Sequence, residues 1–172
     1  MAGNKYLKNT GGYPEEQAAT QTSAGAANAN QIIALDANGK IDVSLLPTGI
    51  GADTAVLPAT EALAAGNYVN IYDSGSGTFS CRKADASGGV AKMAHGFVLA
   101  AVSLGASATI YFEGNNNQVT GMSPGNVWLS ASAPGTGTAT APTGSGNVQQ
   151  RLGVATSASS VNVEFSDPII LA

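Results

Sequence analysis

The stretch that decides the fold is HGFVLAAVSLGASATIYFEG, residues 95–114, the longest apolar run of the chain. It is interrupted once, at Leu104-Gly105, where glycine supplies the positive φ that a tight turn needs. The pieces on either side, 97–102 and 108–112, have the length of strands and are too short for helices. The run therefore predicts a β-hairpin. Because it is almost continuously apolar, both faces of this hairpin are expected to be covered.

The composition is that of one β domain with an appendage. The chain has 172 residues, of which 22 are glycine and only 10% are charged. This length allows one hydrophobic core plus an extension and disfavours two full domains. We therefore expect an all-β fold, either a small barrel or a sandwich. The formal net charge is −4, from seven Lys and Arg against eleven Asp and Glu. Such a chain offers no basic surface for phosphates, so a nucleic-acid partner is not expected.

Short strands separated by turn residues are predicted through the rest of the C-terminal part. A polar loop is expected at 115–117, and a long Gly/Pro/Thr loop with one strand at its middle at 133–147. The segments predicted to hold strands are 68–72, 78–87, 122–131, 149–156 and 161–165, followed by an extended tail from 167 to 172.

Two short motifs recur at a nearly constant spacing. GNYV at 66–69 matches GNVW at 125–128, an offset of 59 (125 − 66), and GFV at 96–98 matches GVA at 153–155, an offset of 57 (153 − 96). One interpretation is an internal duplication, in which each half contributes a turn-strand and a hairpin to a pseudo-symmetric barrel. The other is a chance recurrence of Gly-Asn and Gly-Val in a glycine-rich chain.

Residues 1–55 differ in character from the rest and are interpreted as an extended N-terminal arm before a β domain at 56–172. The first 31 residues are mostly Ala, Asn, Gln, Thr and Gly. Such a segment alone cannot bury enough surface to offset the entropy of ordering it, so we expect it to be mobile in the free protein. Its sizeable apolar residues, predicted to contact a partner, are Tyr6, Leu7 and Tyr13.

The second part of the arm, QIIALDANGKIDVSLLPTGIG at 31–51, is dense in large aliphatic residues. Asn38-Gly39 is a tight-turn signal, which predicts a small hairpin. Alternatively, Asp42 or Ser44 caps one helical turn that Pro47 ends. Either form is marginal alone, so these side chains must pack on the protein's own β domain or on another chain. The predicted interface residues here are Ile32, Ile33, Leu35, Ile41, Val43, Leu45, Leu46 and Ile50.

Signals for export and membrane insertion are not seen. The N-terminal residues include two lysines but no apolar signal-peptide core, and no segment approaches the roughly 18 apolar residues of a membrane span. We expect synthesis in the cytoplasm and no membrane partner. Cys81 is the only cysteine, so it forms no intrachain disulfide, and we interpret it as a half-buried strand residue.

Residues that carry chemistry are few. His95 is the only histidine and has no Ser or Cys nucleophile motif beside it, which favours a structural role. Glu113 and Glu164 end corresponding strands of the two proposed halves, so one interpretation is a catalytic carboxylate pair like that of glycosidases. Carboxylates that end strands at a solvated rim and have no catalytic role are far commoner. A metal site made of several histidines or cysteines is impossible. We therefore expect no catalytic residue, no cofactor and no metal.

The segment 31–51 resembles the G-K-I-x-x-L-D-x-x-G-K-I-D-x-S-x-L-P motif that is common in virion structural proteins of tailed bacteriophages, in head fibres and tail fibres alike. The usual leading Gly-Lys is replaced by Asn30-Gln31. The matching residues are Ile33, Leu35, Asp36, Gly39, Lys40, Ile41, Asp42, Ser44, Leu46 and Pro47.

The later strings GNYVNIY, RKAD, AHGFVLAAV, ATIYFEGNN, GMSPGNVWLS and QQRLGVATSAS resemble the small β domain of phage capsid decoration (cement) or head-fibre proteins. The first motif does not choose between head and tail, whereas the second set favours the head. The resemblance implies a structural protein on the capsid exterior that binds the major capsid protein.

The resemblance also implies a homotrimer, because the fibre-like segment and decoration proteins are usual in threefold assemblies. A closed ring would bury the aliphatic residues of the arm without leaving a free edge. The alternative is a tail-fibre or baseplate module that contacts a host-surface glycan. That function needs an exposed aromatic patch, and Trp128 is interpreted here as a core residue. A virion hydrolase, the third class, lacks a catalytic constellation.

Overall fold

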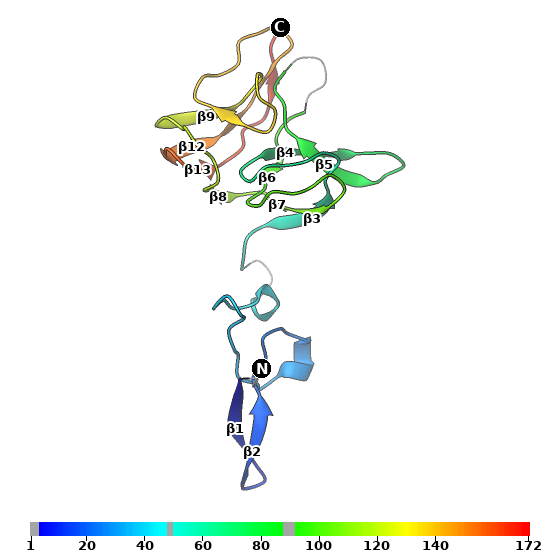
Figure 1. The fold of residues 1–172 in the computed structure, drawn as a ribbon, viewed down its shortest axis with the longest axis vertical. Helices are drawn as coiled ribbons and strands as arrows, with labels where there is room; N and C mark the ends of the chain where they lie inside the picture. The colour runs from blue at the N-terminus through cyan, green and yellow to red at the C-terminus, as the bar shows by residue number, and fades with distance from the viewer. Residues whose placement is uncertain (1–3, 48–49, 88–91) are drawn as a thin grey trace. The chain divides into compact units, whose positions relative to one another are not determined.

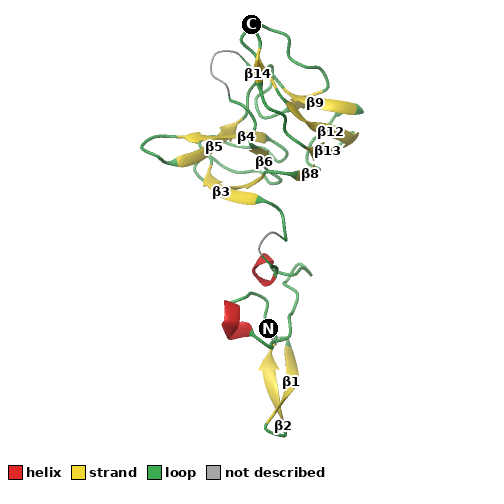
Figure 2. Ribbon diagram, turned by 180° about the vertical axis from the view of Figure 1, so that it is seen from behind, coloured by secondary structure: helices red, strands yellow, loops and turns green. Residues whose placement is uncertain are grey.

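The computed structural model describes residues 4–47, 50–87 and 92–172, and its regular structure is almost entirely β, as predicted (Figure 1). The chain divides into an N-terminal unit, Met1–Gly51, and a C-terminal unit, Ala52–Ala172. The described helical segments are two 3-10 turns, η1 (Gly25–Asn28) and η2 (Val43–Leu45), both in the N-terminal unit (Figure 2). Within the described ranges, no helix is long and apolar enough to cross a membrane.

The N-terminal unit contains one antiparallel hairpin, β1 (Lys5–Thr10) with β2 (Tyr13–Ala18). This hairpin was not predicted from the sequence. Gly11 and Gly12 both adopt positive φ and make the turn, and Lys8 lies opposite Glu15 across the two strands. Cross-strand pairs of opposite charge stabilise such a ladder even where neither face is strongly apolar.

The C-terminal unit contains two five-stranded sheets with the same strand order. When the five strands of each sheet are numbered by their order along the chain, their order across the sheet is 1-5-4-2-3. All neighbouring strands are antiparallel. The first sheet is β3 (Thr54–Pro58), β7 (Ser107–Tyr111), β6 (Gly96–Phe97), β4 (Tyr68–Asp73) and β5 (Phe79–Lys83). The second is β8 (Gly114–Asn116), β13 (Ser160–Val163), β12 (Arg151–Ser157), β9 (Gly125–Leu129) and β10 (Gly137–Thr138).

This shared order supports the internal duplication over the chance recurrence. In Figure 1 the first copy runs from teal to green and the second from yellow-green to orange, one following the other along the chain. The second copy contains one addition, β11 (Val148–Gln149), which pairs with β14 (Ile169–Ile170) near the C-terminus. The predicted polar loop at 115–117 is wrong, because Asn115 and Asn116 belong to β8 and pair with β13.

The recurring glycines have physical causes. Gly66 and Gly125, which precede or begin β4 and β9, have φ of +84° and +117°. In β6, a Cβ on Gly96 would lie 2.7 Å from the carbonyl oxygen of Tyr111, and in β12 a Cβ on Gly153 would overlap the carbonyl oxygen of Asn162. In both copies, therefore, the next strand approaches too closely for a side chain. A bulge before Gly153 shifts the register of the second copy.

Two core clusters organise the C-terminal unit. The first lies between the two sheets and includes Tyr68 and Phe97 from the first sheet together with Leu129 and Leu152 from the second. The second cluster covers the opposite face of the first sheet and includes Val69 and residues from its connections. Neither five-stranded sheet closes into a barrel within the described residues, so the arrangement is that of a sandwich.

The central hairpin forms between β6 and β7, but its first strand is only two residues long, and the pairing is Phe97 with Tyr111. Both faces of the chain are covered here, because Phe97 of β6 enters the first cluster and Val98, the residue after β6, enters the second. The same expectation is wrong for β7. There Ala108 and Ile110 are buried while Ser107 and Thr109 are exposed, since polar and apolar residues alternate along this strand.

Buried amides connect the two copies. Gln150, which is 2% exposed, accepts a hydrogen bond from the backbone N–H of Ala94 (2.8 Å) and donates one to the carbonyl of Ala94 (3.0 Å). Asn116, fully buried, donates to the carbonyl of Gly66 (3.0 Å). These bonds satisfy polar groups that would otherwise be costly to bury, so they specify how the second sheet docks on the first.

Candidate interaction surface

The predicted interface residues of the N-terminal unit are largely exposed. Ala34, which is 8% exposed, is the one buried residue among those of this unit that the structure describes. Tyr6, Leu45 and Leu46 are partly buried. The predicted residues that are exposed are Leu7, Tyr13, Ile32, Ile33, Leu35, Ile41, Val43 and Ile50. The unit therefore presents large apolar side chains without a core of its own.

The β1–β2 hairpin places its aromatic residues on one face. Residues directly opposite each other across an antiparallel pair share a face, and Tyr6 lies opposite Gln17 while Tyr13 lies opposite Thr10. Tyr6 and Tyr13 therefore lie on one face and Leu7 on the other. The sequence signal for this hairpin was the Gly11-Gly12 pair between segments of opposite charge.

The aliphatic segment is held by backbone bonds to the residues that follow β2. The N–H of Thr20 donates to the carbonyl of Ile32 (2.9 Å), and the N–H of Ala34 donates to the carbonyl of Thr20 (2.8 Å). These two bonds form an isolated parallel bridge between Thr20 and Ile33. The bridge buries Ala34 and leaves the larger neighbours Ile32, Ile33 and Leu35 exposed.

Two aspartates shape the rest of the segment. The Asp36 carboxylate accepts hydrogen bonds from the N–H groups of Asn38 and Lys40 (both 2.8 Å), and the bond from Lys40 lowers the pKa of Asp36. Asp42 caps η2 by accepting from the N–H and hydroxyl of Ser44, which lowers the pKa of Asp42. Of the two sequence interpretations, the capped helical turn is the one that forms. A strand pair over 32–46 does not form.

The two glutamates considered for catalysis lie at the same end of one strand pair. Glu113 precedes β8 and Glu164 follows β13, so they flank the last pair of this ladder, Gly114 with Val163. The exposed Glu164 carboxylate pairs with Arg151 at 3.1 Å. Cys81 is fully buried, which raises the pKa of its thiol. The described residues contain no cluster of three or more His, Cys, Asp or Glu side chains that could hold a metal.

His95 has a structural position in the first sheet. Its Nδ1 accepts a hydrogen bond from the backbone N–H of Ile71 at 2.9 Å, and its own backbone N–H donates to the carbonyl of Val69 at 2.8 Å. Partial burial lowers the pKa of the imidazole below its ordinary value of 6.5. The neutral ring, with Nδ1 unprotonated, is therefore the form that stabilises this sheet.

This geometry predicts a loss of stability in mild acid. Above pH 6.5 the ring is neutral in both states, and as the pH falls below 6.5 the unfolded chain takes up the proton more readily than the folded one. Unfolding by urea at successive pH values should show the free energy of unfolding falling by less than about 1 kcal/mol, because the ring is only partly buried. His95→Gln should flatten this part of the profile. An equal fall in the variant would assign the effect to other groups.

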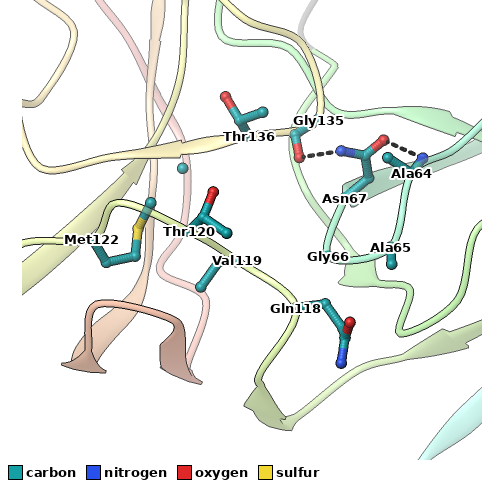
Figure 3. Close-up of a pocket in the computed structure, with 11 residues that line it drawn as sticks. Ala64, Ala65, Gly66, Asn67, Gln118, Val119, Thr120, Met122, Gly135 and Thr136 are labelled. Carbon is teal, nitrogen blue, oxygen red and sulfur yellow. Dashed lines mark hydrogen bonds between the residues drawn. The ribbon is translucent and has the colours of Figure 1, made fainter.

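A cavity of about 400 Å³ lies where the two copies meet (Figure 3). Asn67 is at its edge, with its amide oxygen accepting from the N–H of Ala64 (2.9 Å) and its amide nitrogen donating to the carbonyl of Gly135 (3.2 Å). The lining includes Val119 and Met122 and contains no ionisable side chain. The cavity therefore offers no acid, base or metal ligand of its own.

Comparison with known proteins returned no matching family model, no similar curated protein and no similar solved structure.

Proposed function

We propose that this chain is a virion structural protein that binds the outside of a bacteriophage capsid and ties neighbouring capsid subunits together. The observation that carries the proposal is the contrast between its two units. The C-terminal unit has two core clusters, whereas the N-terminal unit buries only Ala34 among its described residues and exposes eight large apolar side chains. A unit of this kind needs a second surface to bury its apolar residues.

The proposed partner of the N-terminal unit is the major capsid protein. Each large aliphatic side chain contributes roughly 1.5–3 kcal/mol when it is fully buried, so a few of them suffice for attachment. A segment that docks along a partner can also reach over two neighbouring subunits, and separating those subunits then requires releasing both contacts. The shell would be stabilised by this clamp, with no chemical reaction involved.

The resemblance of 31–51 to phage fibre segments supports a virion location but does not choose between head and tail. The second candidate is therefore a tail-fibre or baseplate module that contacts a host-surface glycan. It is favoured by one observation, the position of Trp128, which is partly exposed and belongs to neither core cluster.

Imaging of purified virions separates the two locations. We expect gold-labelled antibodies against the C-terminal unit to decorate the head surface of intact particles. The C-terminal unit is the target because the proposed attachment covers the N-terminal unit. Labelling confined to the tail or baseplate would contradict the capsid proposal and support the second candidate.

We also propose that the free protein is a homotrimer. A threefold ring allows exposed aliphatic residues such as Ile33 and Ile41 to pack against the same segment of a neighbour, leaving no open end. Light scattering after size exclusion at micromolar concentration should give three times the chain mass of 17.0 kDa. A monomer mass would refute the trimer for the free protein.

A further inference from the structure

The outer face of the second sheet, which we define by Asn115, Asn126, Trp128, Arg151, Val154 and Asn162, is the strongest unassigned surface. Val127 and Leu129 point into the core between the sheets, so alternation along β9 places Trp128 on the opposite side. Arg151 lies directly opposite Trp128 on β12 and shares this face. The interpretation of Trp128 as a core residue is therefore wrong.

A row of side chains crosses this face from strand to strand. Asn126 of β9 pairs with Val154 of β12, which pairs with Asn162 of β13, which pairs with Asn115 of β8. The three asparagines are exposed, and Val154 is 39% exposed. The amide of Asn115 accepts a hydrogen bond from the Ser160 hydroxyl.

The side chains of Asn126 and Asn162 make no hydrogen bond to the described part of the chain. The duplication shows that this is a property of the second copy. Asn67, which occupies the place of Asn126 in the first copy, is 8% exposed and uses both ends of its amide in hydrogen bonds within the chain. The outer face of the first sheet is likewise closed, since Val69 is buried there in the second core cluster together with Leu63. Asn67 is thus closed in by Gly135 of the second copy and Val69 by the second core cluster, whereas the corresponding Asn126 is exposed and Trp128 is partly exposed.

The side chains on the outer face of the second sheet favour a neutral ligand that is rich in hydroxyl groups. Arg151 is paired with Glu164, so its charge is compensated and an acidic ligand gains little. Each asparagine amide both donates and accepts hydrogen bonds, as a sugar hydroxyl does. Asn126 and Asn162 are two strands apart, roughly 10 Å, with the apolar Val154 between them. The indole of Trp128 offers an apolar ring surface for the C–H face of a sugar.

We propose that the outer face of the second sheet binds a neutral oligosaccharide, with Trp128 stacking on a sugar ring and Asn126 and Asn162 hydrogen-bonding to its hydroxyls. This inference does not rest on the capsid proposal, because a glycan-binding face works equally on a head or a tail protein. A protein partner is less well matched. The exposed apolar area here is limited to Val154 and part of Trp128.

The test uses the full-length protein and exploits the fact that Trp128 is its only tryptophan. Neutral oligosaccharides of glucose, galactose, mannose and N-acetylglucosamine are titrated, and Trp128 fluorescence and backbone amide NMR shifts are recorded. We expect at least one series to saturate the fluorescence change, with shifted signals in β9, β12 and β13. Asn126→Ala and Asn162→Ala should each weaken that affinity about tenfold.

Thr109→Ala is the matched control, because Thr109 is also an exposed polar side chain in mid-strand but lies on the first sheet. It should leave the affinity unchanged. The proposal is overturned if no neutral series changes Trp128 fluorescence, or if both asparagine variants bind like the unmodified protein. The NMR spectra verify that each variant is folded. Particle labelling addresses the capsid proposal separately, so either proposal can fail alone.

Discussion

Replacing Gly153 by alanine is expected to destabilise the C-terminal unit by about 3 kcal/mol or more, a large part of a typical 5–15 kcal/mol of folding free energy. The residue has φ of +150°, and its Cβ would overlap the carbonyl oxygen of Asn162 on the neighbouring strand. This obstacle is backbone, so no side-chain rotation relieves it. β12 and β13 would have to separate, and both supply the core between the sheets.

Urea unfolding followed through Trp128 measures this effect locally, because Trp128 pairs with Arg151 on the same strand as Gly153. The matched control is Gly125→Ala in the adjacent strand. Gly125 also has a positive φ, of +117°, but a Cβ there would meet no atom within 4 Å. The control should therefore lose only the cost of backbone strain, about 1–3 kcal/mol. Equal losses in the two variants would show that the approach of Asn162 is not what requires glycine.

Removing residues 1–51 is expected to abolish binding to undecorated capsids while leaving the C-terminal unit folded. Both core clusters consist of residues from 59 onward, so the deletion removes no core side chain. The experiment adds full-length and truncated protein to undecorated capsids, at low and high salt, and measures occupancy and the heat resistance of the particles. Because few charges are present, full-length binding should depend only weakly on salt.

Two valines provide a finer comparison in the intact chain. Val43 in the N-terminal unit is 74% exposed and Val56 in the C-terminal unit is 63% exposed, so an aspartate at either position leaves the cores intact. Val43→Asp should lower capsid occupancy, and Val56→Asp should not. Capsid binding by the truncated chain, or release of the full-length protein by moderate salt, would show that the β unit or surface charge makes the attachment.

The duplication allows equivalent positions of the two sheets to be compared. Two copies of one strand order differ in what covers them: the first has a second core cluster on its outer face, and the second has an open row of amides. Equivalent positions therefore carry different roles. Asn67 is part of the internal hydrogen-bonding network, whereas Asn126 is available to a ligand.

Local pattern was enough to predict much of this molecule. Apolar runs of strand length broken by glycine predicted the all-β class and β7, and the repeated Gly-Asn and Gly-apolar pairs pointed to the duplication. The density of aliphatic residues at 31–51 indicated a segment without a core, and Asp42 was recognised as a possible cap. These features depend on residues close together in the chain, where propensity and turn chemistry act directly.

What only the tertiary structure decided are the relations between distant segments. Gly153 must be glycine because the backbone carbonyl of Asn162 occupies the space that a Cβ would need. The hydrogen-bond partner of the Gln150 side chain is Ala94, which lies in the other copy. Whether Trp128 faces the core or the outside depends on the strand pairing of β9, since a shift of one residue exchanges the two faces. Such registers are set by which sheets pack together, and no local pattern in the chain encodes that choice.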